Sequence, residues 1–161
     1  MGVMGGGEGA SPDDCRLAHR LGRLIAGEGW VLLNGGRAAG VMEASARGAK
    51  ENGGLTVGIL PDTGSGLASR YIDIPIATGM GDGRNYINVL SSDVVVALPG
   101  KAGTISEIAL ALKNRKKVIL LRFDAGGLFE IYREKGLLKS AGSAEEAIQL
   151  IKTEYKSYME E

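Results

Sequence analysis

The segment Asp93-Val-Val-Val-Ala-Leu-Pro-Gly-Lys-Ala-Gly-Thr-Ile-Ser-Glu107 decides the fold class of this chain. An acidic residue and five apolar residues lead into Pro99 and Gly100, a second glycine follows, and Thr104 begins an amphipathic run. This order predicts a buried strand, a tight turn and the N-terminus of a helix. Backbone N–H groups converge at such a junction, and the helix dipole attracts anions. The segment therefore predicts a site for a phosphate-bearing ligand.

Short apolar runs alternate with longer helical patterns along the rest of the chain. We expect strands over 1–4, 30–33, 55–60, 71–77, 94–98 and 118–121, and helices over 12–27, 40–52, 84–91, 104–113 and 143–158. Buried strands that alternate with helices predict a single doubly wound, Rossmann-like α/β domain over residues 1–161. Its sheet is expected to be mainly parallel, with helices on both faces, and its ligand to bind at the carboxyl ends of the strands.

Two local features bear on individual strands of this sheet. Pro75 lies within the expected strand 71–77, and a proline in a strand indicates an edge or a bend. The first strand, 1–4, is short for a central parallel strand, so either the strand is stunted or it begins upstream of Met1.

Composition and charge favour a small-molecule partner. The chain has 19 basic and 19 acidic residues, with neither a basic stripe nor a block of like charge, which argues against nucleic acid and anionic membranes as partners. No apolar run approaches the roughly 18 residues of a membrane span. A single cysteine excludes an internal disulfide and is typical of a reducing compartment, so we expect a cytoplasmic protein.

The loop that opens the helix after 94–98 is the first candidate site. Its phosphate-binding groups would be the backbone amides of Gly100, Lys101, Ala102, Gly103 and Thr104, the threonine hydroxyl and the lysine ammonium. The loop lacks the spacing of a Walker A motif, which needs four residues between its first Gly and Gly-Lys-Ser/Thr. The alternative is an ordinary strand-to-helix turn.

Glu107 has two interpretations. The expected apolar stripe of its helix comprises Ile105, Ile108, Ala109 and Leu112, and Glu107 lies on the opposite side of the helix, away from the core. A carboxylate beside a phosphate loop could act on a sugar hydroxyl or a water molecule. Alternatively, Thr104-x-x-Glu107 is a capping box, in which the glutamate only satisfies a backbone N–H.

Two further loops supply candidate ligand contacts. Arg84 follows three glycines at alternate positions and could hold a phosphate group bidentately, and Asn85 could bind the edge of a base or a pterin. Gly35 and Gly36 follow the second expected strand and could form the other wall of the same cleft. The alternatives are a solvated arginine with a capping asparagine and an ordinary helix-entry loop.

Cys15 and His19 are four residues apart, a spacing that places them on one side of a helix. Because no other cysteine or histidine is available, the pair does not predict a zinc site, and we expect no metal centre. Catalysis by a Cys–His pair is disfavoured in the same way, since no pocket signal lies near them.

Three blocks of sequence resemble the lonely-guy proteins, a superfamily long described as lysine decarboxylase-like. Pro99-Gly-Lys-Ala-Gly-Thr-Ile-Ser-Glu107 is similar to their P-G-G-x-G-T-x-x-E motif, and Gly35-Gly-Arg-Ala-Ala-Gly-Val-Met-Glu43 to their G-G-x-x-G-x-M segment. Arg84 stands where they carry an Arg-Lys pair. The blocks occur in the order and spacing of the superfamily over roughly 35–121, which implies its Rossmann-like fold.

The resemblance implies a first enzymatic function. Lonely-guy enzymes are phosphoribohydrolases that release a cytokinin base from a nucleoside 5′-monophosphate, using the arginine and the last glutamate of these motifs. By position, Arg84 would orient the phosphoribose, and Glu107 would stabilise the cation-like ribose or activate water. No metal or redox cofactor would be required.

Other residues resemble a sister branch, the molybdenum cofactor carrier proteins. Asn85 replaces the lysine of the Arg-Lys pair, Lys101 the second glycine, and Ser106 the acid that often precedes the last glutamate. Gly6-Gly-Glu, Ile76-Ala-Thr-Gly-Met-Gly and Thr104-Ile-Ser-Glu-Ile-Ala-Leu-Ala-Leu112 are similar to the carrier branch. That branch holds a phosphorylated pterin without turnover, so the molybdenum cofactor would be bound cargo. The resemblance also implies a homodimer or a higher homo-oligomer, because the relatives pair through helices.

Three functions therefore stand as hypotheses. The first is a non-catalytic binder or carrier of a phosphorylated, nucleotide-like ligand. The second is a phosphoribohydrolase that cleaves the N-glycosidic bond of nucleoside 5′-monophosphates. The third is a structural or interaction protein with a vestigial cleft. No residue distinguishes a base from a pterin as the ligand headgroup.

Overall fold

A seven-stranded sheet in the order β4-β3-β2-β1-β5-β6-β7 forms the centre of the computed structural model, which describes residues 1–159. All its paired strands run parallel. The strands are β1 (Gly2–Met4), β2 (Leu32–Asn34), β3 (Thr56–Leu60), β4 (Ile74–Ala77), β5 (Val94–Ala97), β6 (Lys117–Leu121) and β7 (Leu138–Ala141). The helices are α1 (Pro12–Gly27), α2 (Gly40–Glu51), α3 (Arg84–Leu90), α4 (Ala102–Lys113), α5 (Glu130–Glu134) and α6 (Ala144–Met159), with 3-10 turns η1 (Gly81–Gly83) and η2 (Gly126–Phe129). The doubly wound α/β fold is confirmed.

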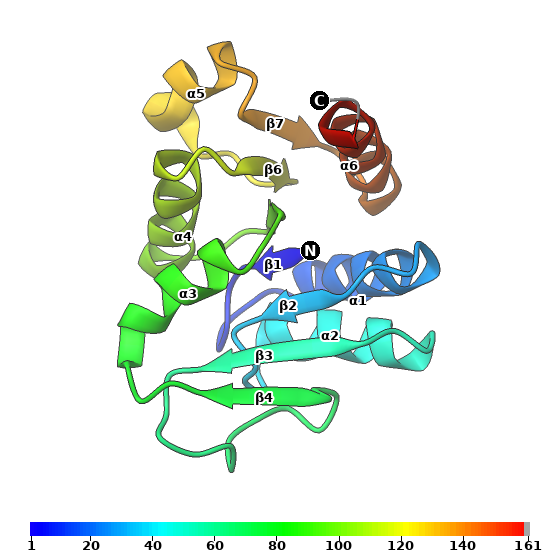
Figure 1. Cartoon of the computed structure of the whole chain (residues 1–161), viewed down its shortest axis with the longest axis vertical. Helices are drawn as coiled ribbons and strands as arrows, with labels where there is room; N and C mark the ends of the chain where they lie inside the picture. Colours follow the sequence, from blue (N-terminus) through cyan, green and yellow to red (C-terminus); the bar gives the residue numbers. More distant parts are fainter. Residues whose placement is uncertain (160–161) are drawn as a thin grey trace.

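Helices cover both faces of this sheet. Figure 1 shows α1, α2 and α6 on one side of the strands and α3, α4 and α5 on the other. The central strand β5 is buried on both faces, because Val94 and Val96 pack into the cluster under α1 and α6, while Val95 and Ala97 pack into the cluster with Ile108 of α4. Continuous apolar runs, in which apolar and polar residues do not alternate, are typical of parallel strands between two helical layers.

Helix starts were the most predictable local features. Ser11 caps α1, since its Oγ accepts a hydrogen bond from the Asp14 N–H at 3.1 Å, and Pro12 occupies the first helical position. Ser143 caps α6 in the same way by accepting from the Glu146 N–H at 3.1 Å, while the Glu146 carboxylate accepts from the Gly142 N–H at 2.7 Å.

The structure adds elements that the sequence pattern did not predict. Residues 122–142 contribute η2, α5 and strand β7, although only the first and last residues of β7 are buried. An edge strand with two buried residues gives no apolar run to detect. The proline in β4 correctly indicated an edge, since β4 pairs with β3 alone.

The order of the strands places the ligand crevice between β1 and β5. From β1 the chain moves outward through β2 and β3 to β4, then returns to the other side of β1 as β5. The connection after β1 leads to α1 on one face, and the connection after β5 leads to α4 on the other (Figure 1). The two loops diverge at this switch point, which is where ligands bind in folds of this type.

No helix in the described chain is both long and apolar enough to cross a membrane.

Candidate ligand-binding site

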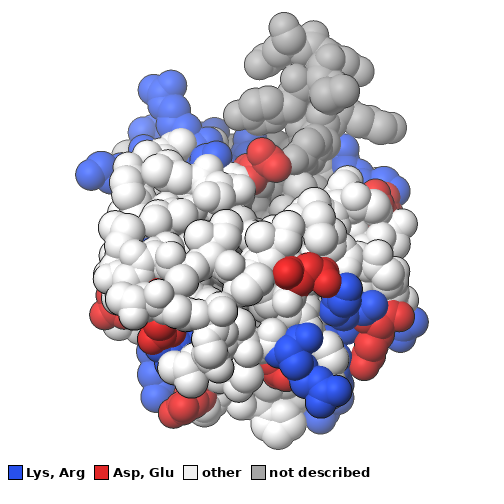
Figure 2. All heavy atoms as spheres, turned by 60° about the horizontal axis from the view of Figure 1, so that its bottom comes forward, with Lys and Arg blue, Asp and Glu red and all other residues white. Residues whose placement is uncertain are grey.

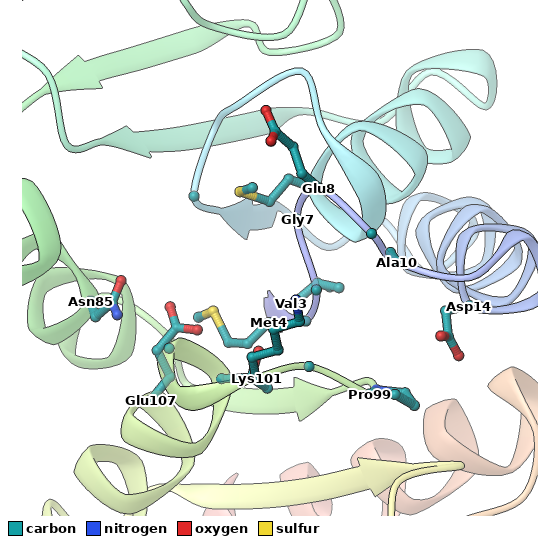
Figure 3. Close-up of a pocket in the computed structure, with 18 of the residues that line it drawn as sticks. Val3, Met4, Gly7, Glu8, Ala10, Asp14, Asn85, Pro99, Lys101 and Glu107 are labelled. Atoms are coloured by element: carbon teal, nitrogen blue, oxygen red, sulfur yellow. The ribbon is translucent and has the colours of Figure 1, made fainter.

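A cavity of about 410 Å³ lies at the carboxyl ends of β1, β2 and β5. Its walls come from the loops that follow these three strands and from α3 and α4. Figure 3 shows Glu107 and Asn85 toward one end of the cavity, Asp14 and Pro99 toward the other, and Lys101 between them. The size falls within the range of small-molecule sites, roughly 300–1,000 Å³.

The glycine loop after β1 is held in place by its neighbours on both sides. The Gly6 N–H donates to the Pro99 carbonyl at 2.9 Å, and the Gly6 carbonyl accepts from the Val41 N–H at 2.9 Å. Gly40 has a φ of +49°, and a Cβ atom there would overlap the carbonyl oxygens of Gly6 and Gly7. A larger residue at position 40 would collide with the glycine loop, so only glycine allows the start of α2 to pack against that loop. This packing fixes the position of the loop in the cavity wall.

The N-terminus of α4 opens onto the cavity. The helix starts at Ala102, and Lys101 at its N-cap makes no side-chain capping bond. The first N–H groups of an α-helix have no partner within the helix and carry the positive end of its dipole. Thr104 is buried with its hydroxyl group against Gly100, where a Cβ atom would overlap it. Lys101 is exposed, and its ammonium group forms no hydrogen bond or ion pair with the described residues.

Arg84 brings a second positive charge to the cavity. Its Nη1 donates to the Ile59 carbonyl at 2.8 Å, and the guanidinium lies over Gly35, where a Cβ atom would overlap it. Burial lowers the pKa of Arg84, and the nearby Glu107 carboxyl group opposes this shift. Among the described residues, no carboxylate lies within ion-pair distance of this guanidinium. A half-buried cation without a counter-ion favours an anionic ligand.

Glu107 is buried between α4 and α3. Its Oε1 accepts a hydrogen bond from Asn88 Nδ2 at 3.0 Å. Burial raises the pKa of Glu107, although the Asn88 hydrogen bond and the charge of Arg84 both oppose that shift. The capping-box interpretation is wrong, because α4 begins at Ala102 and Glu107 lies more than one turn beyond its start.

The expected stripe of α4 also needs correction. Ala109 is exposed, and the buried positions are Thr104, Glu107, Ile108, Ala111 and Leu112. The pattern suggested that Glu107 faces away from the core, but α3 packs beside α4 and covers the glutamate. A single helical stripe cannot reveal a second helix at its side.

The predicted site residues converge on this cavity, with two exceptions. The lining residues among them are Gly35, Arg84, Asn85, Gly100, Lys101, Gly103, Thr104 and Glu107. Gly36 lies beside the cavity lining, where its N–H donates to Asn34 Oδ1 at 2.8 Å and its Cα packs against Gly58. Ala102 stands at the start of α4 without lining the cavity.

Several lining residues were missed by the sequence analysis. They are the glycine loop after β1 with Glu8, and the residues Asp14, Met42 and Asp82. Asn88 was missed too, although it does not line the cavity and lies behind Glu107. The four glycines at positions 5, 6, 7 and 9 were a usable signal, because they follow the first strand directly. Asn88 gave a weaker signal, namely an amide four residues after Arg84 and thus on the same side of α3.

Cys15 and His19 lie elsewhere, in a cavity of about 370 Å³ between α1 and α2. His19 Nε2 lies 2.7 Å from Glu51 Oε2. Within the described residues, no three histidine, cysteine or acidic side chains are grouped in a way that could hold a metal ion.

Comparison with protein families gives a match over nearly the whole chain. Residues 1–150 match the model of the SLOG cluster4 family. The structure of the molybdenum cofactor binding protein from Rippkaea orientalis is similar, with 51% identity, a TM-score of 0.86 and coverage of 94% of both chains. The molybdenum cofactor carrier protein of Chlamydomonas reinhardtii has 42% identity, a TM-score of 0.87 and the same coverage.

A hydrolase is also similar over part of the chain. The cytokinin riboside 5′-monophosphate phosphoribohydrolase of Mycobacterium tuberculosis is 38% identical over 94 residues, which are 57% of this chain and 50% of that protein. The match therefore spans about half the length of the hydrolase.

Proposed function

Because the chain belongs to the SLOG cluster4 family, we propose that it binds a phosphorylated, nucleotide-like ligand and acts as a non-catalytic carrier of the molybdenum cofactor. One observation carries the proposal: the N-terminus of α4, Lys101 and Arg84 all contribute positive charge to one cavity. The similarity to a molybdenum cofactor binding protein over 94% of both chains supports the carrier assignment. The proposal treats the chain as one nucleotide-binding domain of a cytoplasmic protein.

The cavity combines positively charged groups with side chains that can hydrogen-bond the headgroup of a ligand. The amides from Gly100 to Thr104 would bind the phosphate group, and Arg84 with Lys101 would balance its charge. The carboxyl group of Glu107 and the amide of Asn85 are hydrogen-bonding groups for a pterin or a base. The molybdenum cofactor is cargo in this proposal, so the chain needs no resident metal or redox group for its function.

A phosphoribohydrolase is the second candidate. Arg84 and Glu107 line the same cavity, and by the motif resemblance both stand where the lonely-guy hydrolases carry their arginine and last glutamate. In this reaction Arg84 would orient the phosphoribose while Glu107 stabilised the cation-like ribose or activated water. The three replacements at Asn85, Lys101 and Ser106 favour the carrier over the enzyme.

Base release separates the two functions. We expect no free base above the uncatalysed rate when the wild-type protein or Glu107→Gln is mixed with AMP or a cytokinin riboside 5′-monophosphate. A hydrolase would release base, and Glu107→Gln would lower kcat by about 100-fold or more, as for loss of an acid or base. Chromatographic assay of the base, with Glu134→Gln on α5 as the control at an exposed carboxyl group outside the cavity, decides between them.

We also propose that the protein is a homodimer that pairs through an uncovered part of the sheet. Ile74 and Ile76 of β4 oppose Val57 and Ile59 of β3, which pack in the cluster with α3 and α4, yet both isoleucines are more than 40% exposed. Figure 2 shows the side of the molecule toward β4 as a broad area with few charged side chains. An exposed apolar edge strand favours association with a second copy of the chain.

Light scattering tests this assembly. The wild-type chain is expected to have twice the mass of the 16.8 kDa monomer, and Ile76→Lys is expected to be monomeric because it places a charge in the shared apolar surface. Lys152→Ala, at an exposed position on α6, is the control. A monomeric wild type, or an Ile76→Lys dimer, would contradict the proposal.

A further inference from the structure

Asn88 occupies an unusual position in the wall behind the ligand site. It is fully buried on α3, and its Nδ2 donates to Glu107 Oε1 at 3.0 Å. Its Oδ1 is buried as well and has no hydrogen-bond partner in the described part of the chain. A buried amide that makes one bond and leaves an acceptor unpaired is destabilising compared with an apolar residue. The single bond to Glu107 is therefore the feature of this residue that needs an explanation.

The groups around Glu107 indicate what this bond does. Arg84 on α3 is the positive charge that acts on Glu107, yet the Arg84 and Glu107 side chains form no ion pair. Two other charged residues, Asp82 and Lys101, line the same cavity. Burial of Glu107 opposes its ionisation, while the N–H donor of Asn88 favours it. A neutral donor can hold the carboxyl group without neutralising Arg84, so the guanidinium keeps its charge for a ligand.

We propose that Asn88 is a positioning residue for Glu107: it fixes the carboxyl group at the cavity wall and leaves Arg84 free to bind an anion. The inference rests on the proposed function only in assigning Glu107 and Arg84 to a ligand site. The contact itself exists without a ligand, and it is tested without one.

The test is the titration of Glu107 in the ligand-free protein, followed by NMR of ¹³C-labelled glutamate carboxyl groups. The Glu107 signal is identified by its loss in Glu107→Gln. Asn88→Leu keeps the size of the side chain and removes the donor, and it is expected to move the Glu107 midpoint upward by about one pH unit. Asn52→Leu removes an exposed amide at the end of α2, outside the cavity, and should leave the midpoint in place. Equal midpoints in Asn88→Leu and the wild type would overturn the inference.

A second measurement needs no variant of Asn88. In the wild-type protein, the side-chain NH₂ resonances of Asn88 should titrate with the same midpoint as the carboxyl carbon of Glu107, because one donates to the other. Constant Asn88 resonances through the Glu107 titration would contradict the inference, even if Asn88→Leu does not fold. Neither result depends on ligand binding, so a failure of the carrier proposal and a failure of this one are distinguishable.

Discussion

Replacing Arg84 with alanine is expected to weaken binding of a phosphorylated ligand by about 100-fold. The guanidinium is half-buried and faces the cavity, and within the described residues its one hydrogen-bond partner is the Ile59 carbonyl. A charge-assisted hydrogen bond contributes about 1.5–3 kcal/mol, and each 1.4 kcal/mol is tenfold in affinity. Calorimetric titration of the variant and the wild type with the molybdenum cofactor or a nucleoside 5′-monophosphate measures the loss.

A second variant separates the position of this charge from its presence. A Cβ atom at Gly35 would overlap the Arg84 guanidinium, which is the mobile end of a flexible side chain. Gly35→Ala should therefore displace the guanidinium, keep the fold and lower affinity in the same direction as Arg84→Ala. Arg23→Ala, at an exposed position on α1, is the matched control for charge. Unchanged affinity in both cavity variants would show that Arg84 does not bind the ligand.

The largest expected effect on stability comes from Gly48→Ala, at the contact between α1 and α2. A Cβ atom at Gly48 would overlap the His19 carbonyl, and one at Gly22 would overlap the Ser45 carbonyl. Both obstacles are backbone atoms, so the helices would have to separate along their whole contact. Overpacking typically costs about 1–3 kcal/mol, and we expect the upper end of that range. At about 2–4 °C per kcal/mol, the Tm should fall by about 5–10 °C in thermal unfolding.

The control for this variant is another glycine of the same helix pair. Gly27, the last residue of α1, has nothing within 4 Å of an added Cβ and no positive φ. Gly27→Ala should leave stability unchanged or raise it by up to about 1 kcal/mol, because alanine favours the helix. If Gly48→Ala were as stable as Gly27→Ala, the close contact between α1 and α2 would be wrong.

The sequence predicted the fold where local chemistry is strong. The apolar run 94–98, the serine caps of α1 and α6 and the edge proline of β4 each have a local physical cause, and the structure agrees with them. Strand β7 and helix α5 escaped detection because they are short and half-buried, so no periodic apolar pattern marks them.

Within the candidate site, the glycine-rich turns could be predicted and the contacts between elements could not. The loops at Gly35 and Gly100 stand directly after strands, and parallel topology brings such loops to one edge of the sheet. The partners of Glu107 and Arg84 come from other elements, Asn88 from α3 and the Ile59 carbonyl from β3. Because these contacts depend on how α3 packs on the sheet beside α4, sequence spacing alone does not contain them.

The most direct test of the account is thermal unfolding of the wild-type protein with and without the molybdenum cofactor and a series of nucleoside 5′-monophosphates. A ligand at one hundred times its Kd stabilises the folded state by about 2.7 kcal/mol, which corresponds to a Tm increase of about 5–10 °C for a chain of this size. We predict this increase for at least one phosphorylated ligand, with no release of free base. An unchanged Tm with every phosphorylated ligand would contradict the claim that the cavity at β1 and β5 is a phosphate-binding site.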